Sequence, residues 1–259
     1  MNNALMDWSV LLPEIVLASG ICVLLVLDLF VRDSARDLTY LLAIFLLAGV
    51  AWVLIGTSPE STAQLAAGGA YVADDLARVL KLFAVTAVAT VFLYSRAWLR
   101  SRKLHFGEYY VLGLFGLLGV MVLASGYSLL VSYIGLEILS LSLYAMVAFD
   151  RDSARSAEAA MKYFVLGAIA SGTLLYGMSL IYGITGTLQI AELQTTIAAK
   201  SEVVGLWVGL GFIVVGVAFK FGPVPFHMWV PDVYDGAATP VTLYIGTAPK
   251  LGALALAVR

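Results

Sequence analysis

Charged residues, cysteine and histidine are all scarce in this sequence of 259 residues. Asp, Glu, Lys and Arg make up 12% of it, about half the share usual in soluble domains, whereas hydrophobic residues make up 61%. The net charge of −2 offers no basic surface for phosphates, which argues against a nucleic-acid partner. One cysteine, Cys22, and two histidines, His105 and His227, are too few to favour a protein-bound redox metal. We therefore expect no cofactor in this chain.

Nucleotide-binding motifs and a cleavable leader are missing as well. Neither G-x-G-x-x-G nor a P-loop occurs, and the glycines that recur at 113, 116 and 119 and at 205 and 209 indicate helix contacts. Residues 1–7 lack the basic start of a secretory signal peptide, and the apolar run from Val10 past Leu25 is too long for one. The first apolar segment is therefore predicted to be a retained membrane span.

Apolar runs long enough to cross a membrane fill most of the chain. A helix crosses the hydrocarbon core with roughly 20 apolar residues. On that length the sequence predicts an all-α transmembrane bundle of about eight helices, in a single domain covering residues 1–259. The expected spans lie near 8–31, 38–56, 76–98, 109–126, 128–149, 161–183, 203–235 and 241–258.

The seventh segment is too long for one straight helix and is interrupted by Gly222, Pro223 and Pro225. We expect a helix, a break and a half-helix there. Non-helical backbone at membrane depth is tolerated only where it is buried in protein or lines water, and the two prolines leave carbonyls that can orient water or a cation. Pro249 frees a carbonyl in the eighth segment in the same way.

Basic residues predict the orientation, because short cytoplasmic loops are enriched in Lys and Arg. Eight Lys and Arg residues fall on one side of the predicted bundle. The loops on the other side contain only Lys200, and Arg78 lies just inside a helix end there. We therefore expect a multi-pass protein of the inner (plasma) membrane with its N-terminus on the non-cytoplasmic side. The residues that gather on the expected cytoplasmic side are Arg32, Arg36, Arg96, Arg100, Arg102, Lys103, Arg151 and Arg155.

The chain ends at Arg259, directly after an apolar run and without a polar tail. We expect that it is truncated and that further helices follow in the complete protein.

Three charged residues fall where a charge is most expensive, near the middle of a predicted span: Glu137, Lys220 and Lys250. A charge there costs at least about 2.5–3.5 kcal/mol on insertion scales, so it indicates function by default. A buried lysine can lose its proton and a buried carboxyl can gain one, and a close pair of the two reverses both tendencies. Making and breaking a Glu137–Lys220 pair could therefore load and unload a proton. The alternative is a static pair that only fixes helix packing. A structural role is easier to accept for Lys250, because the sequence shows no acidic partner for it.

Other polar residues near these charges have two interpretations. His227 follows the break and could relay protons between Lys220 and Lys250 through water, or it could be a packed or surface histidine. The hydroxyl groups of Ser140, Ser142, Tyr144 and Thr247 could hold waters of such a path, but interhelical hydrogen bonds are the more ordinary role.

The remaining charges fit ordinary positions at helix ends. Lys81 and Arg78, with Asp74 and Asp75 before them, are expected to extend their side chains to the interface and to pair along the helix. Glu14 and Asp28 fall near the ends of the first span, where an interfacial position is expected. Glu158 and Lys162 are spaced for an i,i+4 pair, which favours a structural role for Lys162.

Several segments together carry a family resemblance: LPEI at 12–15, GLEILSL at 135–141, the stretch 157–162, and FKFGPVPFHMWVPDVY at 219–234 followed by Asp-Gly-Ala. On these segments the chain resembles the antiporter-like subunits of respiratory complex I, the NADH–quinone oxidoreductase. The Pro-Asp-Val-Tyr stretch at 231–234 is similar to one branch of that family, whereas sister subunits and the related sodium/proton antiporter subunits usually have Pro-Asp-Ala.

The resemblance implies a translocase subunit that moves protons and performs no redox chemistry of its own. It implies that Glu137 is the carboxylate on helix five, Lys220 the lysine on the broken helix and Lys250 a connecting lysine. Lys162 and His227 match further residues of the same path. The implied partners are other complex I membrane subunits, the lipid bilayer, protons and water; NADH, FMN, iron–sulfur clusters and quinone belong to the wider complex.

The sequence departs from the family in two ways. Ala238 stands where a proline is expected, and the family has about fourteen helices in two inverted repeats, of which this chain holds the first. The alternative functions are a cation/proton antiporter subunit of the sodium/proton type, which needs no electron-transfer partner, and a purely structural membrane scaffold.

Overall fold

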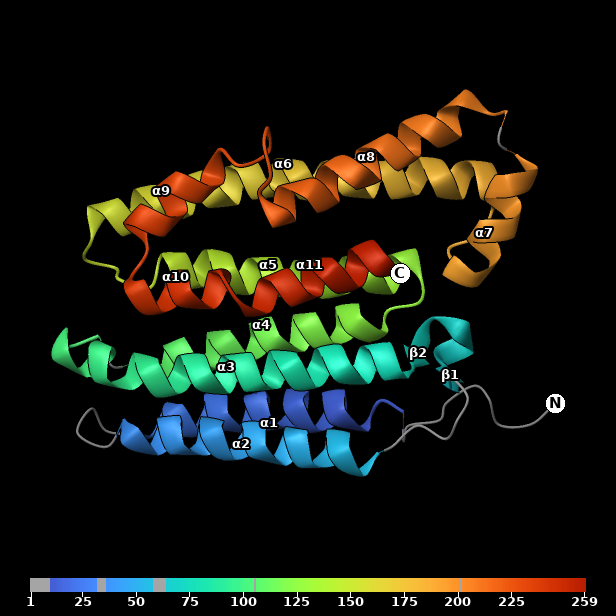
Figure 1. The fold of residues 1–259 in the computed structure, drawn as a ribbon. Coiled ribbons are helices and arrows are strands. Elements are labelled where there is room, and N and C mark those ends of the chain that lie inside the picture. The colour runs from blue at the N-terminus through green and yellow to red at the C-terminus, as the bar shows by residue number, and fades with distance from the viewer. Residues whose placement is uncertain (1–9, 32–35, 58–63, 105, 201) are drawn as a thin grey trace.

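The structure is a computed structural model that describes the chain except for residues 1–9, 32–35, 58–63, 105 and 201. Expectations that concern Arg32, His105 and the start of the first span therefore lie outside the described residues. Long helices side by side make up most of the described chain (Figure 1). In chain order the elements are α1 (Leu12–Asp28), α2 (Asp37–Gly56), β1 (Gln64–Ala66), the 3-10 turn η2 (Ala67–Gly69), β2 (Tyr71–Ala73), α3 (Asp75–Ser101), α4 (Gly107–Ser125), α5 (Leu129–Val147), α6 (Ala154–Thr185), α7 (Ile190–Ala199), α8 (Val204–Phe221), α9 (Trp229–Gly236), α10 (Thr239–Ile245) and α11 (Ala248–Val258).

Within the described residues, seven helical segments are long and apolar enough to cross a membrane, with α10 and α11 counted as one. They are α2, α3, α4, α5, α6, α8 and the α10–α11 segment. Helix α1, with 17 residues, is slightly shorter than these seven segments. The predicted fold class, an all-α membrane bundle of about eight helices with a broken seventh segment, is confirmed.

Three features of the fold were not predicted. The short helix α7 lies between α6 and α8, and an antiparallel hairpin of β1 and β2 fills part of the connection before α3. The eighth segment is also interrupted, because α10 ends at Ile245 and α11 begins at Ala248 with Pro249 in its first turn. Proline fits the first turn of a helix because its missing N–H would have no intrahelical partner there.

The helices form layers in which α4 is central (Figure 1). Helix α4 contacts α1, α2, α3, α5 and α11. Of its most apolar 18 residues 72% are buried, against 22% for α8. A methyl group on Gly119 of α4 would lie 2.5 Å from the backbone nitrogen of Leu139 on α5, so these two helices touch backbone to backbone. Gly177 and Gly209 bring α6 and α8 together in the same way, which confirms that the glycine series mark helix contacts.

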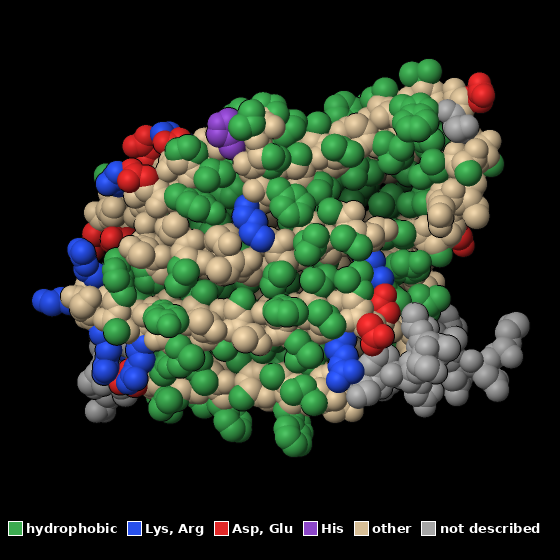
Figure 2. Space-filling model, in the orientation of Figure 1, with side chains coloured by type: hydrophobic (Ala, Val, Ile, Leu, Met, Phe, Trp, Pro, Cys, Tyr) green, Lys and Arg blue, Asp and Glu red, His purple; other side chains and the backbone are tan. Residues whose placement is uncertain are grey.

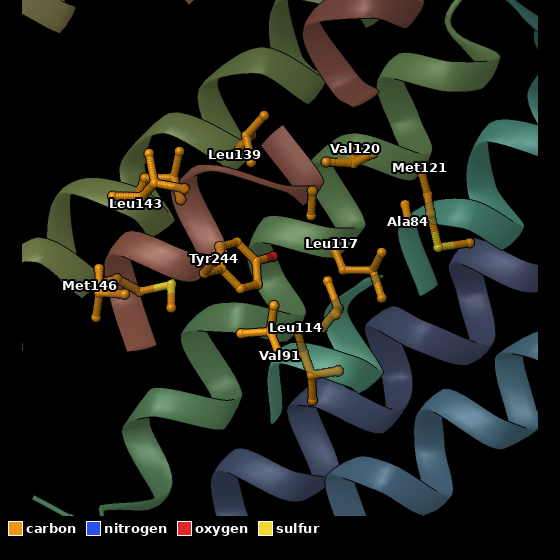
Figure 3. Packing of buried hydrophobic residues seen from close by; sticks show 14 of the residues in the cluster. Ala84, Val91, Leu114, Leu117, Val120, Met121, Leu139, Leu143, Met146 and Tyr244 are labelled. Carbon is orange, nitrogen blue, oxygen red and sulfur yellow. The ribbon is translucent and has the colours of Figure 1, made fainter. Parts of the chain in front are cut away.

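The short helix α10 is anchored in this core by Tyr244 (Figure 3). Its ring lies among apolar side chains of α3 and α4, including Val91 and Leu114, and its hydroxyl donates to the carbonyl of Gly113 at 2.6 Å. Because a buried phenol needs such a partner, this contact fixes α10, and with it the start of α11, against α4.

The two ends of the bundle differ in charge. Lys and Arg side chains gather at the end where α2 and α10 begin, while hydrophobic side chains cover most of the face between the ends (Figure 2). The opposite end holds the hairpin, whose turn has positive φ at Gly68 and Gly69. Strand β2 reaches the α4–α5 turn, where Tyr71 pairs with Gly126 and Tyr127 N–H donates to the Ala70 carbonyl at 2.9 Å.

Candidate functional site

The break that follows α8 begins at Gly222, whose φ of +76° ends the helix in a left-handed conformation. Pro223 and Pro225 cannot donate to the carbonyls four residues earlier, those of Phe219 and Phe221. A buried carbonyl without a donor costs free energy, so the fold must supply other partners at this point.

Side chains from two other elements supply those partners. The indole Nε1 of Trp229, at the start of α9, donates to the Phe219 carbonyl at 3.0 Å. The ammonium group of Lys250, from α11, donates to the Phe221 carbonyl at 2.7 Å and to the Lys220 carbonyl at 3.1 Å. The cation expected beside the break is therefore a lysine side chain of this same chain, placed at the negative end of the α8 dipole.

Lys220 itself is partly buried in the last turn of α8. Its Nζ donates to the Ser140 hydroxyl on α5 at 2.8 Å, and that hydroxyl donates to the carbonyl of Leu136 at 2.6 Å. Ser140 thus makes the interhelical contact expected of it. Among the hydrogen bonds of the described chain, the Ser142 hydroxyl bonds only to a carbonyl of its own helix. The Thr247 hydroxyl, between α10 and α11, bonds only to carbonyls of α10 within the same described residues.

Glu137 lies one helical turn before Ser140 on α5 and is partly buried. Its Oε1 is buried without a hydrogen-bond partner among the described residues, and no ion pair joins it to Lys220 there. The lysine therefore contacts a neutral hydroxyl next to the carboxylate rather than the carboxylate itself. The Tyr144 hydroxyl, one turn further along α5, is likewise buried with no partner in the described part of the chain.

A small cavity of about 20 Å³ lies between the two lysines. Its lining includes Leu136, Ser140, Tyr163, Lys220, Trp229 and Lys250. This volume has room for about one water molecule, and a water there would have both lysines and a serine as polar neighbours.

Two of the candidate residues lie outside this arrangement. Lys162 on α6 is exposed and forms ion pairs at 2.9 Å with Glu158 on its own helix and with Asp232 on α9. His227 is exposed between α8 and α9; its carbonyl accepts from Val230 N–H at 2.9 Å, and its imidazole makes no hydrogen bond among the described residues. The structure thus brings Lys220 and Lys250 together directly, places Glu137 one turn away, and leaves Lys162 and His227 at the surface of the chain.

Glu14 and Lys81 lie near helix ends as expected, but the expectation that Lys81 extends to the interface and pairs along its own helix is wrong. Glu14 on α1 is 6% exposed and Lys81 on α3 is 3% exposed, and their Oε1 and Nζ atoms form an ion pair at 2.6 Å. Lys81 also donates to the Tyr71 hydroxyl at 3.1 Å, so strand β2 covers the pair. In the sequence, the only sign of this pair is an acid near the start of one span and a base near the start of another. Their burial depends on how α4 and the hairpin pack against them.

The described residues contain no group of three or more His, Cys, Asp or Glu side chains that could hold a metal ion. The chemistry that the side chains of the site offer is therefore that of amines, hydroxyls and a carboxyl.

Lysines buried at a discontinuous helix in a membrane bundle are typical of ion-coupled membrane transporters. The chain belongs to the NADH:quinone oxidoreductase/Mrp antiporter transmembrane family, whose family model matches residues 126–259.

Within this family the resemblance is to subunit N of NADH–quinone oxidoreductase. The chain is 55% identical to that subunit from Thioalkalivibrio sulfidiphilus over 98% of its own length, and 50% identical to that from Thiobacillus denitrificans over its full length. It spans about half the length of these curated relatives, 53% and 54% respectively.

Solved structures show the same fold. A chain of respiratory complex I from Thermus thermophilus has a TM-score of 0.79 and 32% identity, with 95% of this chain and 52% of that chain covered. A chain of the Mrp complex from Dietzia sp. has a TM-score of 0.78 at 22% identity, covering 97% of this chain and 48% of that one, and shows likeness of fold alone.

Proposed function

We propose that this chain is part of the proton-translocating membrane subunit of NADH–quinone oxidoreductase. In this proposal, electron transfer from NADH to quinone takes place in other subunits, with their FMN and iron–sulfur clusters, and this chain moves protons in response. Its partners are the other membrane subunits of the complex and the lipid bilayer. The basic end of the bundle faces the cytoplasm, which puts the N-terminus on the other side of the inner membrane.

The observation that carries this proposal is the meeting of Lys250 with the backbone of Lys220 at the break of α8. Two proton-carrying amines at a helix break, with a water-sized cavity between them, form a short path for protons across the bundle interior. Glu137 has a buried oxygen without a hydrogen-bond partner among the described residues, one turn from Ser140. When the Lys220 side chain changes rotamer, its ammonium can leave the Ser140 hydroxyl and pair with the Glu137 carboxylate.

Lys162 and His227 have places at the surface end of this path in the proposal. Lys162, held by Glu158 and Asp232, would supply charge at the α6–α9 surface, and His227 would exchange protons with water beside the break.

A cation/proton antiporter subunit is the second candidate, and the description of the matching family model, which includes Mrp antiporters, favours it. The two candidates differ in their requirement for electron transfer. Quinone-reductase activity that is lost when the chain is deleted supports the first candidate, and sodium/proton exchange without NADH supports the second.

The test uses the full-length protein in membrane vesicles with the variants Lys220→Ala and Glu137→Ala. We expect NADH-driven proton uptake to be lost in Lys220→Ala and reduced in Glu137→Ala, while the complex still assembles. Lys103→Ala, which removes an exposed lysine at the basic end, is the control and should pump normally. Undiminished pumping by Lys220→Ala would contradict the proposal.

A further inference from the structure

The buried Glu14–Lys81 pair plays no part in the path described so far. It joins α1 to α3 at the end of the bundle opposite the basic residues, with Glu14 in the first turn of α1 and Lys81 in the second turn of α3. Ionisable side chains that are this deeply buried in a membrane helix are costly to retain and indicate function by default.

The surroundings of the pair are incomplete for a static salt bridge. Beyond the Oε1 contact with Lys81, no hydrogen bond of ordinary geometry reaches either carboxylate oxygen of Glu14 within the described residues, although the Tyr71 phenol lies close by. A buried ion pair stabilises a fold only when further hydrogen bonds satisfy its remaining lone pairs and protons. The carboxylate therefore has unused acceptor capacity next to a proton donor.

The Tyr71 hydroxyl adds a third proton-carrying group, 3.1 Å from the Lys81 ammonium. Burial, and next to it the charge of Glu14, raises the pKa of the Tyr71 phenol well above its ordinary value. The phenol therefore keeps its proton and can pass one on, accepting from Lys81 while donating elsewhere.

Two buried serines, Ser125 and Ser132, form a short row near Tyr71 at the α4–α5 turn. Tyr71 pairs through its backbone with Gly126, and a methyl group on Gly126 would lie 3.0 Å from the Ser132 hydroxyl on α5. The Ser125 hydroxyl, at the end of α4, is buried without a partner among the residues that the structure describes. Ser132 is five residues before Glu137 on the same helix. Hydroxyls both donate and accept, so this row can support proton transfer together with water.

We propose that Glu14, Lys81 and Tyr71 form a second proton-transfer site, through which protons leave the bundle at the end opposite its basic residues. In the transfer step, an N–H bond of the Lys81 ammonium breaks and an O–H bond forms on Glu14, which leaves a neutral amine beside a neutral acid. The acid then releases its proton to water outside, and the amine takes the next proton from protonated water of the bundle interior, with each serine hydroxyl giving up one proton as it accepts another. This inference rests on the proposed proton-translocating function.

The test needs variants that separate proton transfer from structural support. Glu14→Gln with Lys81→Met removes both charges at similar volume, a change that is often neutral or stabilising for a buried pair. Lys81→Arg keeps the ion pair, but a guanidinium does not give up its proton in proteins. The matched control is Asp28→Asn with Arg36→Gln, which removes an ion pair between α1 and α2 at 3.0 Å near the other end.

The measurement is the number of protons taken up per NADH oxidised by vesicles carrying the full-length variants, with Lys220→Ala measured in parallel. We expect both Glu14/Lys81 variants to assemble and oxidise NADH but to lose proton uptake, and the control to keep it. Proton uptake at the wild-type ratio in either variant would overturn the inference. Failure of both variants to assemble also counts against it, because the pair would then serve the fold. If Lys220→Ala pumps normally, the proposed function fails, whichever result the Glu14/Lys81 variants give.

Discussion

The two buried lysine sites of this bundle hold their charges in different ways. Lys81 contacts the Glu14 carboxylate at 2.6 Å, so base and acid are already joined. Lys220 contacts the Ser140 hydroxyl at 2.8 Å, and Glu137 lies one helical turn from that serine on α5. Lys250 depends on carbonyls at the end of α8.

This difference teaches that the two sites suit different steps. In the Glu14–Lys81 site a proton can pass between partners that stay in place. In the mechanism we propose for the α8 break, Lys220 moves from Ser140 to Glu137, so that step can be gated by a conformational change of the helix break. The predictions below test this contrast, beginning with the largest expected effect.

Breaking the fixed pair should cost the most stability. Lys81→Met leaves the Glu14 charge buried without its partner, which should lower the free energy of unfolding by about 3–5 kcal/mol. Lys220→Met removes no ion-pair partner and should cost less. Chemical denaturation of the purified protein, followed by circular dichroism, measures both. Equal losses for the two variants would contradict the contrast, and Glu14→Gln should restore most of the stability lost in Lys81→Met.

The next largest effect should come from Lys250→Met, because it leaves two carbonyls at the end of α8 without donors. Each unsatisfied carbonyl should cost about 1–3 kcal/mol. Trp229→Phe removes the donor of one carbonyl, that of Phe219, and should cost about half as much by the same argument. Denaturation midpoints rank the two variants. If Trp229→Phe were the more destabilising, the assignment of carbonyl partners at the break would be wrong.

Ser140→Ala should have a smaller effect on stability, about 1 kcal/mol, because a water in the adjacent cavity can replace the lost hydroxyl. It should nevertheless change proton uptake, since it removes the neutral acceptor that competes with Glu137 for Lys220. Ser142→Ala is the matched control, because within the described residues that hydroxyl bonds only to a carbonyl of its own helix. The same pumping rate in both variants would argue against a gating role for Ser140.

The smallest effect is expected at the surface cluster around Lys162. Glu158→Ala removes one of two partners of an exposed lysine, and solvent screens such pairs strongly. The melting temperature should stay unchanged within error at physiological salt. A clear drop in the melting temperature would contradict this expectation and show that the Lys162 cluster holds α6 against α9.

The sequence predicted the α8 break and its lysines well, because their signals are local. Pro223 and Pro225 interrupt an apolar run, and Lys220 and Lys250 each fall inside one. Which side chains would satisfy the freed carbonyls depends on where α9 and α11 lie, and no spacing along the chain reveals that.

Glu14 and Lys81 show the opposite case. Each lies within two turns of a helix end, a position from which a single helix can extend a charged side chain to the interface. Their burial results from tertiary packing, with strand β2 placing Tyr71 against Lys81. The hairpin itself was not predicted, because its strands have three residues each and no clear alternation.

One substitution tests most directly whether Lys220 transfers protons or only supplies a charge. Lys220→Arg keeps a positive charge and a donor for Ser140, but arginine does not release its proton under these conditions. Proton uptake per NADH oxidised, measured in vesicles with the full-length protein, should be lost in Lys220→Arg while the complex assembles as in the wild type. Wild-type proton uptake in this variant would contradict a transfer role for Lys220 and leave it a static charge.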